Sequence, residues 1–584
     1  MASASSEPHR AAGRSAWLRA HVPALTWVPR SRPTLTRDVV AGVTLWGLIV
    51  PEGMAYAGLA GLPPQAGLYT VLVSLVLYAA LGTSRHMVVA ATSASAALTG
   101  SIIATLHPPD AGAYSAYASA LVLLVGVLFL LAGLLRLGFV AQFLSRPVME
   151  GFIVGLAFFV AVGQLHKIFG VKKGDGNTPQ KLWHVLSDVG STNVWTLSVG
   201  VGCLLLLVGL PRLSKRVPAG LVVLALAIGL SSLLDLKGRH NVEVVGRIPH
   251  GLPGLSLPQI HAADLWTLLP AAAGIVLLAY SEGLAIAESF ARRYGYEIDP
   301  NQELLAIGTA NLASGSVGGL VACGGMSGSA VNDGAGARTQ LSGATAALLA
   351  LVTVLALTPL FTNLPEAALG ALIIHAVIHL MRPTKILAVR RVAPTEFLLA
   401  LTALFGVLFL DVLEGLVIAT LVSLLLVIYR SSRASVVALG TSASGGADWV
   451  ALTRHAEAAP LPGVLVLSLD APMYYANASA NRDEIKRLVG AAVTPIQAVV
   501  LDPEVQHDLD VTSAETLIEI VEWLSARGIE VIVVATHVDL VAQAERAGVL
   551  DVLGRDHLEP TLAAAVSRAV IVASPATPPQ PGRP

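Results

Sequence analysis

The heptapeptide Pro51-Glu52-Gly53-Met54-Ala55-Tyr56-Ala57 returns further along the chain as Ser281-Glu282-Gly283-Leu284-Ala285-Ile286-Ala287. Each copy lies inside a long apolar stretch and contains one carboxylate. Residues 88–95 (VVAATSAS) align in the same way with residues 320–327 (LVACGGMS), at nearly the same offset. Two weak repeats in the same order indicate a duplicated membrane unit, the usual plan of secondary transporters.

The composition is that of a polytopic membrane protein. Of the 584 residues, 54% are hydrophobic and 13% are charged, whereas soluble domains average about 25% charged residues. Apolar runs close to the roughly 20 residues needed to span hydrocarbon recur between positions 39 and 429. The net charge of −1 gives no reason to expect nucleic acid as a partner. Cys203 and Cys323 lie in apolar segments, so no disulfide framework, metal site or cofactor is expected.

The apolar segments predict about 14 membrane spans in two sets of seven. A cytosolic N-terminal arm (1–37) precedes transmembrane repeat 1 (38–235), an extracytoplasmic loop (236–266) and transmembrane repeat 2 (267–430). Because seven is odd, the second copy must have the opposite orientation to the first. The expected spans are 38–60, 64–82, 88–106, 116–137, 147–168, 193–210 and 218–235, then 267–290, 303–318, 322–338, 341–360, 365–381, 394–409 and 411–429.

The distribution of basic residues predicts that both termini are cytosolic. With the N-terminus inside, the extracytoplasmic lysines and arginines fall mainly in the two longest loops, which count least in the positive-inside rule. The connections predicted to be cytosolic contain Arg85, Arg136, Arg146, Arg212, Lys215, Arg216, Arg292, Arg293, Arg338, Arg382, Lys385, Arg390, Arg391, Arg430 and Arg433. We expect a multi-pass protein of the cell membrane.

A second, soluble domain follows the last span. Residues 431–448, which include the flexible run Ser442-Ala443-Ser444-Gly445-Gly446, are expected to form a linker. Residues 449–570 alternate strand and helix patterns, with strands near 464–469, 498–501 and 530–535. Strands separated by helices predict a small α/β domain with parallel strand pairs. The proline-rich tail, residues 571–584, is expected to be disordered.

Two motifs resemble those of the SulP family of anion transporters. The run from Pro51 to Tyr69 (PEGMAYAGLAGLPPQAGLY) resembles the family signature, and residues 329–332 with 337–343 resemble its second signature. The soluble part is similar to a STAS domain, notably in residues 470–478 and 510–517. Together the resemblance covers about residues 35–570.

The resemblance implies a 7+7 inverted repeat with core and gate subdomains, like that of uracil permease, and a homodimer that moves anions by an elevator-like mechanism. The third and tenth spans would be half-helices that meet at mid-membrane. Unpaired N–H groups at two helix N-termini create an anion site without Lys or Arg. The expected substrate-binding residues are Ser93, Ala94, Ser95, Gly325, Met326 and Ser327; close packing of small residues is the alternative interpretation.

Glu52 and Glu282 are the predicted proton carriers. An ionised carboxylate at bilayer depth costs at least about 2.5–3.5 kcal/mol on insertion scales, and protonation avoids much of that cost. The alternative is that either residue lies at a helix end in water or caps a backbone break. For Glu52 a break is expected at Pro51.

Two departures from the family pattern affect the expected substrate and the coupling ion. Many relatives have an arginine where Gly328 stands, so the dianion sulfate is weighed against bicarbonate and dicarboxylates. Relatives that use sodium place threonines at the positions of Ile286 and Met326. Neither side chain offers an oxygen, and hard cations need several, so H⁺ is expected rather than Na⁺.

The expected function is import of a small anion, with sulfate as first choice, coupled to H⁺. The alternatives are a Na⁺-coupled bicarbonate or dicarboxylate transporter, an anion exchanger or channel, and a membrane sensor that signals through the STAS-like domain. No nucleophile–base set or phosphate loop suggests an enzyme. Thr512 matches the regulatory phosphorylation position of bacterial STAS proteins, but an N-cap with Glu515 completing a capping box is the preferred interpretation.

Overall fold

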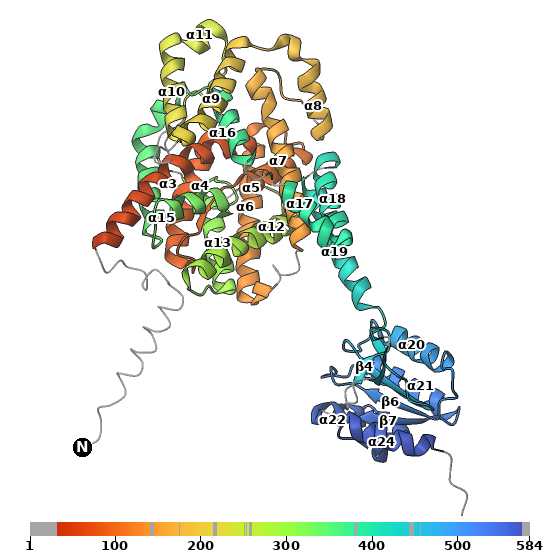
Figure 1. Cartoon of the computed structure of the whole chain (residues 1–584). Helices are drawn as coiled ribbons and strands as arrows, with labels where there is room; N and C mark the ends of the chain where they lie inside the picture. The colour runs from red at the N-terminus through yellow and green to blue at the C-terminus, as the bar shows by residue number, and fades with distance from the viewer. Residues whose placement is uncertain are drawn as a thin grey trace, which may run out of the picture. The chain divides into compact units, whose positions relative to one another are not determined.

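The computed structural model describes residues 32–574 except 140–144, 175, 214–218, 250, 253, 256–257, 259, 379–380, 382, 411, 443–448, 456 and 536. The chain divides into two compact units, residues 1–423 and 424–584, and each is described by itself (Figure 1). Most of the expected N-terminal arm (1–37) and of the expected tail (571–584) lies outside the described residues.

The first unit is a bundle of helices. Its first half contains α3 (Arg32–Leu59), α4 (Pro64–Leu81), α5 (Ser93–Thr105), α6 (Ala111–Leu134), α7 (Arg146–Phe169), α8 (Thr178–Ser187), α9 (Val194–Leu213), α10 (Ala219–Leu234) and α11 (Leu236–His240). Its second half contains α12 (Ala262–Tyr294), α13 (Pro300–Ser316), α14 (Met326–Gly334), α15 (Leu341–Val352), α16 (Glu366–Ile378), α17 (Pro383–Val392), α18 (Pro394–Phe409) and α19 (Val412–Ser431), which extends into the second unit.

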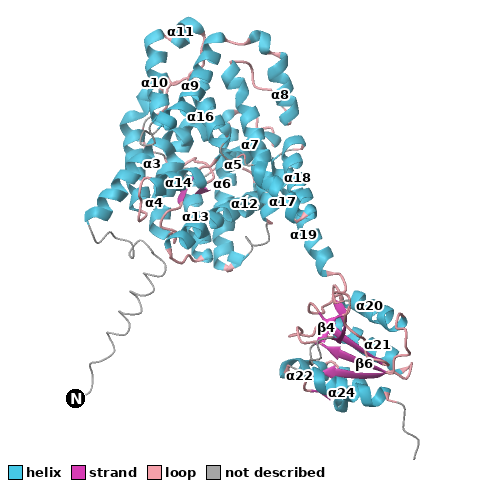
Figure 2. Cartoon of the chain, viewed as in Figure 1, coloured by secondary structure: helices cyan, strands magenta, loops and turns pink. Residues whose placement is uncertain are grey.

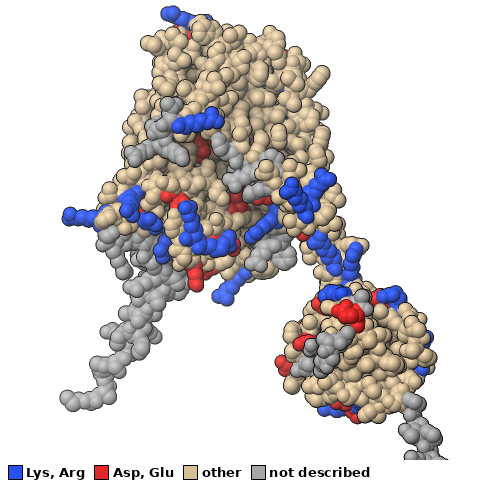
Figure 3. Space-filling model, in the orientation of Figure 1, with Lys and Arg blue, Asp and Glu red and all other residues tan. Residues whose placement is uncertain are grey.

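Within the described residues, eight helices are long and apolar enough to cross a membrane, and several shorter apolar helices lie between them. Charged side chains gather in a band near the end of this unit where α13 lies, and much of the visible surface above the band is uncharged (Figure 3). The total of 14 spans stays a prediction.

Three local features differ from the expected segments. Helix α3 continues through Pro51 to Leu59, so the expected break at Pro51 is wrong; the chain tolerates the lost N–H because the helix is packed on its neighbours. Helices α8 and α17 lie in connections for which no helix was expected. Helix α15 ends at Val352, and its expected span continues as a π-helical segment (Thr353–Leu357) and a 3₁₀ turn (Thr358–Phe361).

Helices α6 and α13 pack closely because small and large residues alternate across their contact. Four glycines at this contact each face a leucine on the other helix, and a methyl group added to any of the four would come within about 3 Å of that leucine. The pairs are Gly126 with Leu312, Gly133 with Leu305, Gly308 with Leu130, and Gly315 with Leu123. Such interlocking is the usual basis of helix association in membranes, where burial of apolar area gives no net gain.

A short pair of antiparallel strands lies inside the helical bundle (Figure 2). Strand β1 (Val88–Ala90) pairs with β2 (Cys323–Gly325). Ser74 of α4 donates its hydroxyl to the central carbonyl of β1 at 2.8 Å. Asn311 of α13 donates to the carbonyl of Ala322 at 2.7 Å and accepts from its N–H at 2.9 Å. Non-helical backbone inside a membrane protein needs such partners, since lipid offers none.

The second unit is built on a six-stranded sheet in the order β4-β3-β5-β6-β7-β8. The strands are β3 (Val436–Thr441), β4 (Trp449–Ala451), β5 (Val464–Leu469), β6 (Ala498–Asp502), β7 (Glu530–Val534) and β8 (Leu558–Glu559). Strands β5 to β8 are parallel, and β3 is antiparallel to both neighbours. Because β3 lies within the expected linker (431–448), the domain begins about 13 residues earlier than predicted.

Helices cover both faces of this sheet. Successive residues of β5 point to opposite faces, so Leu465 joins one apolar core and Val466 the other. The first core includes residues of α20 (Ala478–Gly490), α21 (Val511–Ser525) and α23 (Val549–Leu553), and the second includes residues of α24 (Leu562–Ala573). Helix α22 (Val538–Arg546) lies beside α23.

Candidate functional site

The half-helices α5 and α14 begin side by side. Each follows one of the paired strands directly, since α5 begins three residues after β1 and α14 begins at the residue after β2. The Thr92 Oγ1 atom lies 3.2 Å from the Cys323 Sγ atom. A methyl group added to Gly325 would come within 3.3 Å of Thr92 Cγ2. The two segments predicted to bind substrate therefore meet in the interior of the membrane unit.

The start of α14 is open. Its N-cap is Gly325, and within the described residues no side chain caps this end. Met326 is 43% exposed, and Ser327 is exposed as well. The first N–H groups of a helix have no partner inside the helix, and the helix dipole places about half a positive charge there. This end offers hydrogen-bond donors and positive potential to an anion.

The start of α5 is closed by its own side chains. The Thr92 hydroxyl accepts from the N–H of Ser95, and the Ser95 hydroxyl accepts from the N–H of Thr92, which is a capping box. Ser95 also donates to the carbonyl of Val321 at 3.0 Å. Ser93, Ala94 and Ser95 are 6%, 7% and 2% exposed. Ser95 therefore joins the two repeats, and the capping box satisfies its N–H group at this end.

The two predicted proton carriers lie beside these helix starts. Glu52 is 6% exposed, and its carboxylate lies within hydrogen-bonding reach of the Ser327 hydroxyl. Tyr56, one turn further along α3, lies within electrostatic range of both Glu52 and Glu282. Glu282 is half-buried and lies within electrostatic range of Cys323. Both carboxylates thus face one cluster around the helix starts.

Close backbone contact places Glu282 against β2. A methyl group added to Gly324 would come within 2.8 Å of the Gly283 Cα atom and 2.5 Å of the Met87 Sδ atom. Only hydrogen atoms fit between the two glycines, so α12 can touch the strand directly. The glycine after each glutamate in the repeated heptapeptide is a close contact point, because a methyl group added to Gly53 would likewise come within 3.2 Å of the Gly67 carbonyl oxygen of α4.

Two other buried carboxylates of the unit have a structural role. Asp38 accepts from the N–H of Arg338 at 2.6 Å and from the N–H and hydroxyl of Thr339. Glu303 accepts from the Tyr78 hydroxyl at 2.8 Å and from donors of residues 83 and 84. These carboxylates hold loops in place through several donors. In the described residues, Glu52 and Glu282 have no backbone donor, which sets them apart.

Every predicted substrate and proton residue of the membrane unit belongs to this cluster, whereas Thr512 lies in the other unit. The N-cap assignment of Thr512 is wrong. Helix α21 begins at Val511 and is capped by Asp510, whose carboxylate accepts from the N–H of Ser513 at 2.9 Å. The helix dipole favours a negative charge at the N-terminus, so Asp510 is the better cap. The helix therefore begins two residues earlier than predicted. Thr512 is exposed in the first turn.

Sequence reasoning missed the capping role of Thr92 and the structural role of Ser95. The signal was present, because a threonine followed three residues later by a side chain that can accept is the pattern of a capping box. In the described residues, no group of three or more His, Cys, Asp and Glu could hold a metal ion.

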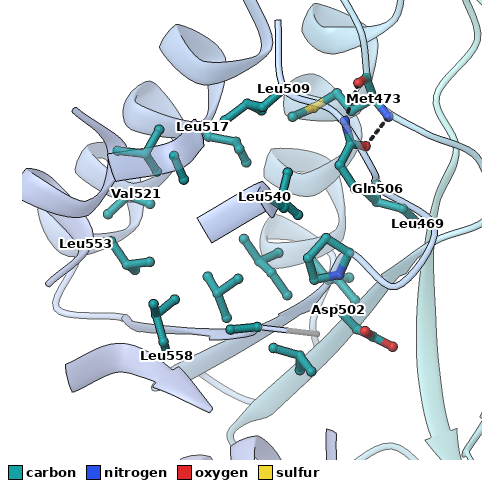
Figure 4. Close-up of a pocket in the computed structure, with 18 of the residues that line it drawn as sticks. Leu469, Met473, Asp502, Gln506, Leu509, Leu517, Val521, Leu540, Leu553 and Leu558 are labelled. Atoms are coloured by element: carbon teal, nitrogen blue, oxygen red, sulfur yellow. Dashed lines mark hydrogen bonds between the residues drawn. The ribbon is translucent and has the colours of Figure 1, made fainter. Parts of the chain in front are cut away.

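The second unit contains an apolar cavity of about 100 Å³. Figure 4 shows Leu517, Val521, Leu540, Leu553 and Leu558 around it. At its edge, Gln506 accepts from the N–H of Met473 and donates to its carbonyl, each at 2.7 Å. Burial raises the pKa of Asp502, which lies on the same edge.

Fold and site together define a helical membrane protein in which two helix starts and two carboxylates form one cluster. Residues 35–403 match the model of the sulfate permease family, and residues 455–565 match that of the STAS domain. The chain belongs to the sulfate permease (SulP) family and is an anion transporter. The predicted membership is confirmed, and so is the fold class of a helical membrane transporter with a C-terminal STAS domain.

One relative agrees with the family assignment, and two solved structures agree with the fold. A probable sulfate transporter of Mycobacterium tuberculosis is 33% identical over 535 residues, which cover 92% of this chain and 95% of that protein. The structure of the murine anion transporter solute carrier 26 family member A9 in the inward-facing state has a TM-score of 0.89 at 22% identity and covers 98% of this chain and 96% of that chain. The membrane domain of a cyanobacterial bicarbonate transporter has a TM-score of 0.59 at 24% identity, over 68% of this chain and 97% of that chain.

Proposed function

We propose that this transporter imports sulfate together with H⁺, and that the anion binds at the start of α14. The observation that carries the proposal is the pairing of an open helix N-terminus with a carboxylate: Ser327 is exposed at the uncapped end, and Glu52 faces it. An anion near this carboxylate is repelled while the carboxylate is ionised and tolerated once it is protonated. Binding of the anion and binding of the proton therefore favour each other.

Glu282 is the second proton carrier. Its carboxylate lacks the backbone donors that stabilise the ionised forms of Asp38 and Glu303 in the described part of the chain. A half-buried carboxylate without such donors takes up a proton more readily than a well-bonded one. Glu52, Glu282 and Tyr56 form the path along which the proton reaches the cluster.

Sulfate is the first choice because the Mycobacterium relative carries that name. Sodium coupling is disfavoured because Ile286 and Met326 supply no side-chain oxygen near the cluster, and a hard cation needs several. The anion moves by an elevator-like rotation of the core past the gate, in a homodimer of the cell membrane with both termini in the cytosol. The arginines near the ends of the spans support this orientation.

The test uses purified protein in liposomes and a panel of labelled sulfate, bicarbonate and dicarboxylates. An inward proton gradient should drive sulfate accumulation, and a sodium gradient at equal pH should not. Accumulation driven by sodium, or preference for bicarbonate, would replace the proposal by the corresponding alternative. Equilibration without accumulation under either gradient would indicate an exchanger or a channel.

The STAS domain is proposed to modulate transport and to take no part in substrate selection. A chain that ends after Arg433 should reach the membrane in smaller amounts but rank the anions as the full chain does. Retained transport would also count against the sensor hypothesis, in which signalling through the soluble domain is the function.

A further inference from the structure

The membrane unit contains a polar cavity outside the cluster at the helix starts. It has a volume of about 840 Å³ and is lined on one side by α3, α5 and α6 and on the other by α7 and α8. We call it the lysine vestibule. The helix α8, which forms part of its wall, lies towards the end of the unit away from the band of charged residues (Figures 1 and 3).

The charged side chains that line the vestibule in the described residues are all basic. They are Lys167, Lys173 and Lys181, with His107 and His166 beside them. Lys181 lies over the ring of Phe159, with its Nζ atom 4.4 Å from the ring centroid. A cavity with charge of one sign and low-dielectric walls concentrates ions of the opposite sign and raises their rate of entry.

Lys167 is the most enclosed of the three lysines. Its side chain is 13% exposed, and its Nζ atom lies 3.1 Å from the Glu366 carboxylate, which is 34% exposed. A methyl group added to Gly58 of α3 would lie 3.4 Å from the same Nζ atom. The ammonium group thus reaches from α7 across to α3, next to a carboxylate that an incoming anion would have to replace.

Gln164, one turn before Lys167, supplies an independent sign of a ligand. Its side chain lines the vestibule, the residue is 3% exposed, and its Oε1 atom has no hydrogen-bond partner in the described structure. A buried amide without a partner costs stability unless a ligand or water meets it. The Oε1 atom is an acceptor, so it calls for a donor such as water or the hydroxyl of a protonated oxyanion, whereas the NH₂ group of the same side chain can donate to an oxyanion held by Lys167.

The vestibule reaches nearly to the cluster. Ala97 of α5 lines it, and Ala97 follows Ser93 by four residues, about 6 Å along the helix axis. We propose that the vestibule is the outer binding station for the transported anion, a small oxyanion, held by Lys167 and Gln164 with Glu366 as the resident counter-ion. The direction of use rests on the proposed function, but binding in the vestibule does not.

The test measures the potential in the vestibule without requiring transport. Gly163 lines the cavity, and a methyl group added there meets no atom within 4 Å, so Gly163→Cys is a suitable reporter. The native Cys203 and Cys323 are buried, and the parent chain gives the background. The reporter should react with an anionic thiosulfonate reagent faster than with its cationic counterpart, by roughly tenfold, and sulfate should slow the anionic reaction.

Substitutions then assign the effect. Lys167→Gln should remove most of the preference, Glu366→Gln should increase it, and the double variant should lose the protection by sulfate. Lys172→Gln is the matched control, because Lys172 is exposed and outside the lining. Equal reactivity with both reagents, or an effect of Lys167→Gln no larger than that of Lys172→Gln, would overturn the proposal.

Flux assays in oriented liposomes complete the test. The KM for anion on the extracytoplasmic side should rise several-fold in Lys167→Gln, with the KM on the cytosolic side unchanged. If the reporter prefers the anionic reagent but the protein does not transport sulfate, the proposed substrate is wrong and the proposal for the vestibule stands. If the protein transports sulfate but the reporter shows no preference between the two reagents, the proposal for the vestibule is wrong and the proposed substrate stands.

Discussion

The starts of α5 and α14 occupy equivalent places in the two repeats but are satisfied in different ways. At α5 a threonine and a serine close the helix end, and the first three residues are buried. At α14 the equivalent place is taken by glycines and Met326, the end is uncapped in the described structure, and Ser327 is exposed. The two segments therefore share a backbone plan, while only one helix start remains open to a ligand.

The remainder of α14 is anchored. Ser329 accepts from the N–H of Val88 at 2.9 Å, and Asn332 donates to the carbonyl of His86 at 3.2 Å. Asp333 accepts from Arg293 at 2.7 Å and also from the Tyr294 hydroxyl. An open end on a fixed helix is preorganised for binding, because the donors need not be ordered when the anion arrives. The comparison predicts that changes at α14 alter function and changes at α5 alter stability.

The largest effect is expected for Glu282→Gln. This substitution keeps the shape but removes the proton site, so accumulation driven by a proton gradient should fall to the level of empty liposomes while anion binding persists. Glu52→Gln should reduce accumulation less. Glu303→Gln is the control. It weakens the hydrogen bonds that the Glu303 carboxylate accepts, so the amount of protein in the membrane should fall, while the protein that remains should still couple transport to the proton gradient. Unchanged accumulation in Glu282→Gln would remove this residue from the mechanism.

Leucine at position 327 should have the next largest effect. Ser327→Leu fills the space in front of the open helix end, so sulfate affinity should drop at least about tenfold, or roughly 1.4 kcal/mol, at normal abundance. Ser95→Leu should instead overpack a buried site and cost roughly 1–3 kcal/mol of stability, seen as lower abundance after solubilisation. Equilibrium binding of labelled sulfate and size-exclusion profiles distinguish the two outcomes. Wild-type affinity in Ser327→Leu would place the anion elsewhere.

The sequence is sufficient to predict the membrane class and to select residues that the structure brings together in the cluster, whose roles in binding and coupling stay predictions. A lone carboxylate inside an apolar run is costly and is retained where it serves a function, and the two aligned segments point to the small residues beside it. The continuation of α3 through Pro51 was not predictable, since local propensity favours a break and packing opposes it. The lysine vestibule depends on contacts between segments far apart, such as Lys167 with Glu366, which no local pattern contains.

In the soluble domain the errors have local causes. Strand β3 lies in the stretch that the sequence predicts as a linker, because it follows the last span closely; in the structure its residues alternate between buried and half-buried. Asp510 and Thr512 are both acceptable N-caps, and the carboxylate is the one that caps the helix. The first error misses a strand, and the second shifts a helix boundary by two residues.

A smaller effect is expected when a charge is added to the open end. Gly328→Arg should raise the preference for dianions over monoanions a few-fold, because a full charge would join the partial charge of the helix in a low-dielectric site. A methyl group at position 328 would lie 3.1 Å from Val88 Cγ1, so the double variant with Val88→Ala provides room. Competition between labelled sulfate and monoanions measures the ratio. An unchanged ratio in the double variant would show that the anion does not approach this turn of α14.

The smallest effect on transport is expected at the closed end. Thr92→Ala removes the cap of α5 and should lower stability by about 1 kcal/mol, while sulfate affinity stays within about twofold of wild type, a difference below about 0.5 kcal/mol. Thr99→Ala is the control within the same helix. The Thr99 hydroxyl donates to the carbonyl of Ser95 and does not cap an N–H group at the helix start. Thermal stability in detergent and sulfate binding give the two quantities. If Thr92→Ala instead weakens sulfate binding by tenfold or more with stability intact, the capped end of α5 is itself part of the anion site, and the difference between the two helix starts is one of geometry alone.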